Sequence, residues 1–282
     1  MKKTGFLLAF TLGFFAAAFA QSGWVKEKGQ YFVKADLAVF QSRSYYNPLG
    51  TKVITSVFSQ QMLNLYAEYG LGKRLALQGS FPVLRFNRYS GTQPAIGQGD
   101  LKLEVKYALL KGKTPLSLTI SPELPTGRAN AFANNKNIPG DQINLPTGDG
   151  EFNVWTTLAL SRGFGKVYAT IWSAYNVRTQ YKGEIFQDVW QAGAEIGGAP
   201  AKNLWINAKL RTQTSMGASV SPNLGFVRGD ASEFTQVSLG AYYKFRPKGG
   251  IAADLSAISG FLQPLTNMYA GSSFSLGWVW EY

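Results

Sequence analysis

The sequence predicts an all-β fold: a transmembrane, antiparallel, up-and-down β-barrel of about 12 strands, of the outer-membrane type. Three observations predict it. From Gln30 onward, stretches with period-two alternation recur, each about ten to fifteen residues long, which is enough for a tilted strand to cross a bilayer. Short and long connections alternate between these stretches. The last eight residues, 275–282, place large apolar side chains on alternate positions and end on Tyr282.

Residues 1–20 are typical of a signal peptide. A basic start at 1–3 is followed by an apolar run over 5–17 and by a small-x-small site that ends at Ala20. The apolar run is shorter than the roughly twenty residues that a membrane-spanning helix needs. We therefore expect cleavage between Ala20 and Gln21, export to the bacterial outer membrane of a Gram-negative cell, and a single barrel domain over 21–282.

The expected strands follow in order along the chain. We place them at about 30–41, 59–70, 74–86, 99–110, 115–125, 151–162, 167–178, 187–197, 203–214, 233–245, 250–259 and 268–282. Short connections are expected at 70–73, 111–114, 163–166, 198–201 and 246–249, and long ones at 42–58, 87–98, 126–150, 179–186, 215–232 and 260–267. Strict alternation of this kind is typical of short periplasmic turns and long external loops.

One face of each expected strand is apolar, as Leu37, Leu65, Val105 and Leu239 illustrate. A Lys or Arg at the bilayer midplane costs about 2–4 kcal/mol, so an uncharged face is what lipid requires. The closing strand continues this pattern. Its spacing resembles the closing-strand signal of outer-membrane barrels, so we expect an assembly signal, recognised by the barrel-assembly machinery, at Gly277, Trp280 and Tyr282.

The formal net charge is +12, and most of the excess falls in the amino-terminal stub and the short turns. The sequence therefore predicts a basic ring at the periplasmic rim, where each cation contributes about 1 kcal/mol through anionic lipid headgroups. Turn lysines that only discourage aggregation are the alternative. Outer-membrane lipid and lipopolysaccharide are the expected partners, and nucleic acid is not, because no basic patch is interleaved with exposed aromatic residues.

The inward face carries nearly balanced charge, and two interpretations stay open. In the first, the lumen is cross-linked by ion pairs, because a buried charge persists only when it is paired. In the second, Arg178, Lys209 and Arg211 line an opening near the external ends of the seventh and ninth strands, and a channel there would be constricted by loop 126–150 or by inward aromatic residues. The candidate lumen-lining residues are Lys102, Glu104, Lys106, Trp155, Trp172, Arg178, Lys209 and Arg211.

The chain contains no cysteine and no histidine. Disulfides and thiolate chemistry are therefore absent, as are the commonest general base and the commonest metal ligand. We expect no enzyme activity, no cofactor and no metal centre. The carboxylates Asp141, Asp149 and Glu151 could bind Ca²⁺ as an alternative to being solvated loop residues.

Two turn motifs repeat, each a leucine followed by Pro-Thr-Gly, and with three other short motifs they resemble one family. The five are Leu124-Pro125-Thr126-Gly127, Leu145-Pro146-Thr147-Gly148-Asp149-Gly150, Gly99-Asp100, Lys106-Tyr107 and Tyr66-Ala67-Glu68-Tyr69-Gly70. The resemblance is to an outer-membrane family labelled phenol meta-pathway degradation or transporter, and it is clearest over about 97–175. It implies an outer-membrane barrel and the passage of aromatic or other hydrophobic small molecules.

The sequence favours a passive channel or transporter for small molecules, hydrophobic or aromatic ones among them. About nine residues precede the first strand, too few for a plug domain, so transport is expected to be diffusive. One alternative is a closed structural barrel whose external loops bind a partner or lipopolysaccharide. Another is an acidic-sugar porin, which would require Arg178, Lys209 and Arg211 to be unpaired and to face one another.

Overall fold

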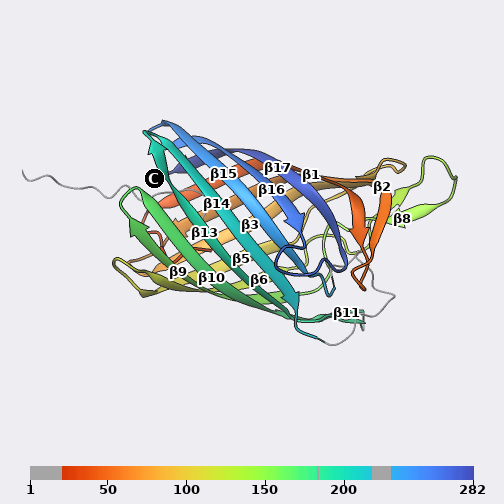
Figure 1. Cartoon of the computed structure of the whole chain (residues 1–282), viewed down its shortest axis with the longest axis horizontal. Coiled ribbons are helices and arrows are strands. Elements are labelled where there is room, and N and C mark those ends of the chain that lie inside the picture. The colour runs from red at the N-terminus through yellow and green to blue at the C-terminus, as the bar shows by residue number, and fades with distance from the viewer. Residues whose placement is uncertain (1–20, 183, 218–229) are drawn as a thin grey trace, which may run out of the picture.

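A computed structural model describes residues 21–182, 184–217 and 230–282, and within them every regular element is a β-strand. The strands form one closed antiparallel barrel of 12 strands over the described residues, as predicted (Figure 1). The barrel strands are β1 (Tyr31–Tyr46), β2 (Lys52–Gly70), β3 (Leu75–Tyr89), β4 (Ala95–Gly97), β5 (Leu101–Leu110), β6 (Leu116–Leu124), β9 (Asn153–Phe164), β10 (Val167–Arg178), β13 (Val189–Ala201), β14 (Leu204–Ser215), β15 (Phe234–Arg246), β16 (Gly249–Ser259) and β17 (Met268–Glu281).

Within that barrel, β4 and β5 keep one register against β3 and act as a single broken strand. Two short hairpins lie in the long loops: β7 (Phe132–Asn134) with β8 (Gln142–Asn144), and β11 (Gln180–Tyr181) with β12 (Glu184–Ile185). No helix in the described ranges has the length and apolar content needed to cross a membrane. The expected signal peptide and part of the expected loop 215–232 lie outside the described residues.

The first and last strands close the barrel, as predicted. The register between β1 and β17 runs from Phe32 opposite Glu281 to Tyr46 opposite Met268. Beyond this register, the Tyr31 amide donates to the Tyr282 carbonyl (3.1 Å), and the Tyr282 amide donates to the Tyr31 carbonyl (3.0 Å). The two ends of the folded domain are therefore joined directly by hydrogen bonds.

The outward face is apolar, which confirms the predicted parity of the strands. Leu37 is 64% exposed, Leu239 58% and Trp280 43%, although all three are large hydrophobic residues. Buried positions such as Lys34, Glu104 and Thr170 carry the opposite parity and point inward. The polar groups thus fill the barrel, and the apolar ones surround it as lipid requires.

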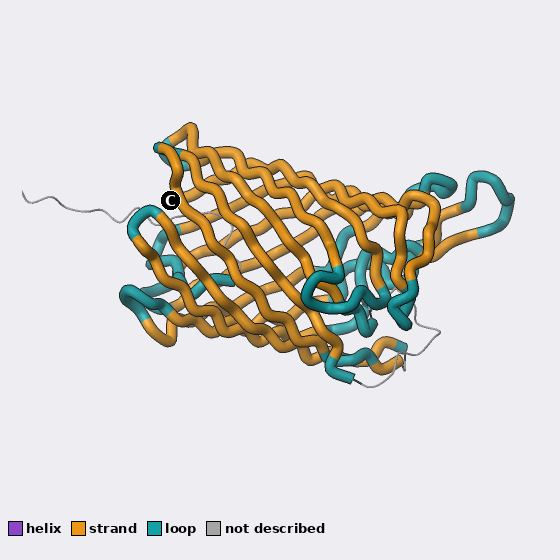
Figure 2. Tube along the Cα trace, in the orientation of Figure 1, coloured by secondary structure: helices purple, strands orange, loops and turns teal. Residues whose placement is uncertain are grey.

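Both ends of the barrel have the predicted character. Short turns and the carboxyl terminus lie at one end, and the long loops lie at the other (Figures 1 and 2). However, β1 and β2 are 16 and 19 residues long and leave only residues 47–51 as their connection. The expected long loop 42–58 is therefore mostly strand, a hairpin that extends past the neighbouring strands.

Pro82 interrupts the wall in β3. Proline has no amide hydrogen for the ladder, and the register against β2 shifts here, between Leu63 and Asn64. Val83 is an extra residue in β3 with no partner on β2. Beyond it, towards the long loops, each position points to the opposite face from the one that period two predicts. Arg85 consequently points inward, which a simple period-two pattern does not predict.

Candidate functional site

Asp100 holds loop 126–150 inside the external end of the barrel. Its carboxylate accepts hydrogen bonds from the amide of Gly127 (2.9 Å) and from the amide of Asp149 (2.8 Å). These two amides belong to the two Pro-Thr-Gly turns. A Cβ on Gly148 would overlap the Asp100 carboxylate, and one on Gly127 would overlap Gly148. The glycines of both motifs are therefore required by close approach, and the repeat is a two-part anchor for one loop.

The threonines complete this anchor. Thr126 donates from its hydroxyl to the Gly99 carbonyl (2.7 Å), and the Thr147 hydroxyl accepts from the Arg128 amide (3.1 Å). Thr147 is fully buried. The loop therefore packs into the lumen as a constriction, which is one of the two constrictions that the sequence left open.

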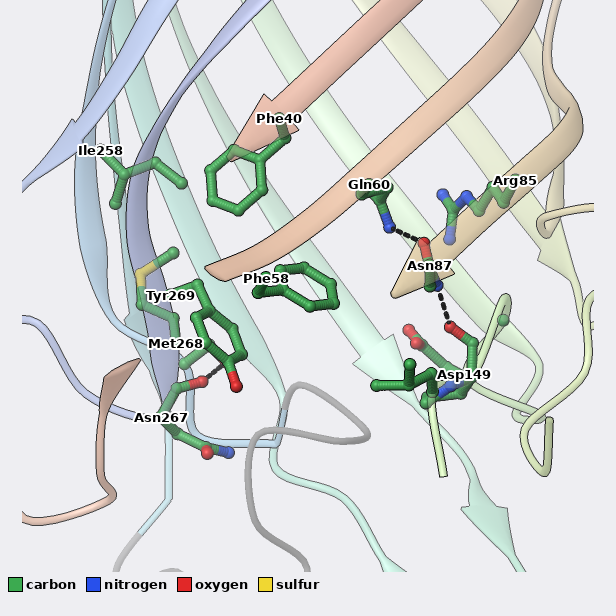
Figure 3. A pocket seen from close by; sticks show the side chains of 14 residues that line it. Phe40, Phe58, Gln60, Arg85, Asn87, Asp149, Ile258, Asn267, Met268 and Tyr269 are labelled. Atoms are coloured by element: carbon green, nitrogen blue, oxygen red, sulfur yellow. Dashed lines mark hydrogen bonds between the residues drawn. The ribbon is translucent and has the colours of Figure 1, made fainter. Parts of the chain in front are cut away.

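A cavity of about 340 Å³ lies beneath this loop. Figure 3 shows an apolar side and a polar side. Apolar contacts come from β1, β2, β16, β17 and the loop, and the rings of Phe58 and Tyr269 stack with centroids 4.7 Å apart. The apolar lining residues are Phe40, Phe58, Leu145, Ile258, Met268 and Tyr269.

The polar side of the cavity comes from β2, β3 and the loop. Gln60 donates to Asn87 (2.9 Å), which in turn donates to the Pro146 carbonyl (2.6 Å), as Figure 3 shows. Arg85 donates from Nη1 to the Thr147 carbonyl (2.8 Å). Its Nε is buried and has no hydrogen-bond partner within the described part of the chain. The cavity therefore combines an aromatic wall with a polar wall that includes Gln60, Asn87 and Asp149.

Asp149 adds a titratable group to the same wall. Burial raises the pKa of its carboxyl to about 6, and the charges of Asp100 and Glu123 act in the same direction. The guanidinium groups of Arg178 and Arg85 oppose this rise. The charge of the cavity therefore changes near neutral pH.

The candidates on β5 and beside it contact one another or the amino-terminal segment. The Lys102 ammonium lies 5.2 Å from the centre of the Trp155 ring, and Trp155 donates to Glu123 (3.1 Å). Glu104 accepts from Ser121 (3.2 Å). Lys106 is 1% exposed and donates to the hydroxyl of Ser22 (3.3 Å).

Trp172 lies on β10 against β13. Its ring covers Gly193, where a Cβ would overlap the indole, so this glycine leaves room for the tryptophan.

The three candidate cations farther round the barrel all have partners. Arg178 donates from Nε to Glu151 (2.7 Å), and its guanidinium also covers the ring of Phe186 (4.9 Å). Lys209 lies 3.9 Å from Glu195. These contacts fit the first interpretation, a lumen cross-linked by ion pairs.

Arg211 donates from Nη2 to Gln236 (2.6 Å). Two further pairs, Lys34 with Asp254 (2.9 Å) and Lys244 with Glu281 (2.8 Å), extend the network. Arg178 and Lys209 are paired with carboxylates, so the three unpaired cations that an acidic-sugar porin would require are not found together, although the Nε of Arg211 is buried with no hydrogen-bond partner among the described residues.

Of the acidic loop residues considered for Ca²⁺, Asp141 lies apart from Asp149 and Glu151. Asp141 accepts from Asn135 (2.8 Å) on the projecting hairpin, whereas Glu151 contacts Arg178. Within the described ranges, no group of three or more Asp or Glu side chains is placed to hold a metal ion.

The closing-strand residues lie at the short-turn end. Trp280 and Tyr282 are exposed, and Gly277 is buried against Asp36 of β1. Basic residues of the rim lie over rings at this end: Lys248 is 4.1 Å from the centre of the Tyr282 ring, and Arg246 is 5.3 Å from that of Trp278. The aromatic girdle and the basic ring therefore form one surface, and the assembly role of these residues stays a prediction.

Sequence reasoning missed the amino-terminal segment as a part of the lumen. Residues expected to be too few for a plug domain enter the barrel, where Ser22 and Gly23 are buried. The Ser22 carbonyl accepts from Ser117 (2.7 Å), and the Gly23 amide donates to Ser161 (2.8 Å). The apolar pair Trp24-Val25 in an otherwise polar stub was the available signal.

Comparison with known proteins gives a likeness of fold. No protein-family model matches the chain, and no curated protein matches it in sequence. An outer-membrane channel from Pseudomonas putida F1 superposes with a TM-score of 0.68 at 18% identity, covering 92% of this chain and 97% of that one. The translocator domain of the autotransporter NalP from Neisseria meningitidis follows at 0.53 and 10% identity, covering 91% and 90%. The β domain of the Bordetella autotransporter BrkA gives 0.52 at 11%, covering 91% and 100%. The fold is thus that of outer-membrane barrels.

Proposed function

We propose that this protein is a passive outer-membrane channel for small molecules, hydrophobic or aromatic ones among them. The observation that carries the proposal is the cavity beneath loop 126–150, which offers solutes a partly aromatic site at the external end of the barrel. Its volume of about 340 Å³ is at the small end of ligand sites. The cavity would hold one ring, with the polar wall of Gln60, Asn87 and Asp149 beside it.

Location and substrate class rest on further support. The similar structure from Pseudomonas putida F1 is an outer-membrane channel, and the apolar belt here has the aromatic girdle that such barrels carry. The resemblance to the family labelled phenol meta-pathway degradation or transporter points to the same class of solute. The chain would reach the membrane through its signal peptide and the closing-strand signal.

Solute flux into proteoliposomes tests this proposal. Wild-type protein should admit small neutral aromatic alcohols faster than sugar alcohols of similar size. Phe58→Ala, which removes one ring of the cavity, should lower this preference, whereas Phe274→Ala on the lipid-facing side, 51% exposed, should not. Absence of flux and of conductance in planar bilayers would refute the proposal.

A second candidate is a closed barrel that binds a partner or lipopolysaccharide through its loops. The observation that favours it is the packing of one wall, where Ser117 and Ser121 on β6 have no exposed surface. Deleting residues 132–144, the projecting hairpin, should then abolish lipopolysaccharide binding without altering flux.

A further inference from the structure

Arg211 lies on the inward face of β14, where polar side chains of the lumen keep accessible surface. It has the same parity as Lys209, whose side chain is 27% exposed and lies 3.9 Å from Glu195. Arg211 itself is half-buried. By contrast, Ser117 and Ser121 on β6 have no exposed surface. A solute inside the barrel therefore finds accessible space beside Arg211.

Arg211 also lacks the carboxylate partner that other cations of the lumen have. Four of these cations each contact an Asp or Glu: Lys34, Arg178, Lys209 and Lys244. Within the described part of the chain, Arg211 contacts only the amide oxygen of Gln236 (2.6 Å from Nη2) and the ring of Phe234. A guanidinium group is always charged in proteins, so the charge of Arg211 is not neutralised by an ion pair.

The three guanidinium nitrogens differ in what they leave for a ligand. Nη2 uses one hydrogen on Gln236, and Nε is buried with no hydrogen-bond partner among the described residues. Nη1 is neither buried in this way nor hydrogen-bonded to a described residue. Nη1 and the second hydrogen of Nη2 therefore form an end-on pair of donors, which matches the two oxygens of a carboxylate.

Aromatic rings lie on both sides of this guanidinium group. The ring of Phe234 has its centre 5.0 Å from the guanidinium carbon. On the other side, Trp172 on β10 is paired with Gly193 on β13, and Gly193 is paired with Arg211. A Cβ on Gly193 would overlap the indole, so the Trp172 ring lies over the glycine. The indole therefore fills the space between its own strand and Arg211.

One row of residues connects Arg211 with the cavity beneath loop 126–150. Gln236 is paired with Ile258 on β16, and Ile258 lines the cavity (Figure 3). The Gln236 amide donates to Ser256 (2.9 Å), which holds its oxygen towards Arg211. Arg211 is two strands from Ile258, a separation of about 10 Å. A small molecule that leaves the cavity along this wall therefore meets Arg211 next.

We propose that Arg211, Trp172 and Phe234 form a binding site for aromatic monocarboxylates inside the barrel. The guanidinium group pairs with the carboxylate, and the indole contacts the ring of the solute. One cation without an ion pair suits one carboxylate, whereas an acidic polymer would need several. This inference rests on the proposed channel function and names a substrate class for it.

Single-channel recording in planar bilayers tests the site with benzoate. Sodium benzoate, added above neutral pH, should interrupt the current of the wild-type channel, because the bound anion occupies the pathway. Benzamide has nearly the same shape but no charge, and it should not interrupt the current. Arg211→Gln should shorten the residence time of benzoate about tenfold, through the loss of one charge-assisted pair. Arg211→Met, a second neutral replacement, should have the same effect.

Lys244→Gln is the matched control for charge. It also removes an inward cation, but one that is paired with Glu281 (2.8 Å), and it should leave the residence time of benzoate unchanged. Equal shortening by Lys244→Gln and Arg211→Gln would mean that benzoate responds to the net charge of the lumen, and would refute the site.

Trp172→Leu tests the aromatic part of the site. It should shorten the residence time of benzoate but not that of acetate, which has no ring for the indole to contact. Equal effects on the two anions would refute the role of Trp172.

The wild-type protein separates this site from the channel function. If it conducts and admits neutral aromatic alcohols, but benzoate leaves its current unchanged, the site is refuted and the channel stands. If it neither conducts nor admits aromatic alcohols, the channel function is refuted and the site with it.

Discussion

Replacing Asp100 by alanine should release loop 126–150 from the lumen while leaving the barrel intact. The carboxylate accepts two amide hydrogen bonds, at 2.9 and 2.8 Å, from the two Pro-Thr-Gly turns. Hydrogen bonds to a charged group contribute about 1.5–3 kcal/mol each, and the lower value applies because Asp100 is half-buried. The loss is therefore about 3 kcal/mol, confined to the loop.

Hydrogen exchange measures this loss directly. Peptides that cover residues 129–146 should lose protection by a factor of about 100, since each 1.4 kcal/mol changes an opening equilibrium tenfold. Peptides from β14 to β16 should not change. Asp141→Ala is the matched control, because that carboxylate also accepts a hydrogen bond (2.8 Å) but lies on the exposed hairpin. Equal effects of the two variants, or none from Asp100→Ala, would refute the anchor.

Four further predictions concern the wall, the cavity and the closing strand. Leu239→Arg places a charge on the lipid-facing side of β15 and should lower the free energy of unfolding by about 2–4 kcal/mol. Guanidinium unfolding in phospholipid vesicles measures this loss. An unchanged midpoint would contradict the outward position of Leu239. Burial raises the pKa of Asp149 to about 6, so its neutral form stabilises the folded loop at acidic pH, and this contribution is lost as pH rises through 6. Loop exchange, corrected for intrinsic rates, should therefore be faster at pH 8 than at pH 5, and Asp149→Asn should remove the difference. Arg178→Gln leaves Glu151 buried without its cation and should cost about 3–5 kcal/mol in the same unfolding assay, most of which Glu151→Gln should restore. Deleting Tyr282 should impair membrane insertion, measured as the fraction of heat-modifiable barrel in the outer membrane, and normal insertion would refute the assembly signal.

The lipid-facing architecture was predictable because it depends on local pattern. Trp280 and Leu239 are exposed as their parity predicts, since in a barrel every strand meets the same two environments. The count of strands and the alternation of connections follow from the same regularity. Neither requires knowledge of which residues touch across the lumen.

The features inside the barrel depend on contacts between distant residues, and sequence pattern carries less information about them. Pro82 has no amide hydrogen for the ladder, so the register shifts there and Arg85 points inward. A simple period-two count along the sequence would place Arg85 on the outward face. Asp100 meets Gly127 and Asp149 only because the loop returns over β5. The repeated motifs marked turns correctly, but their common carboxylate partner became visible only in three dimensions.

The direct pairing of Tyr31 with Tyr282 makes the chain suitable for circular permutation. Backbone hydrogen bonds of 3.0 and 3.1 Å join these residues, so a short linker from Tyr282 to Gln30 would close the seam covalently in a chain without residues 21–29. New ends could then be opened at an exposed turn such as the one at Gly72. In such a chain β17 would lead directly into β1, so the assembly of the permuted barrel would show whether the motif of β17 functions within a continuous strand-to-strand connection.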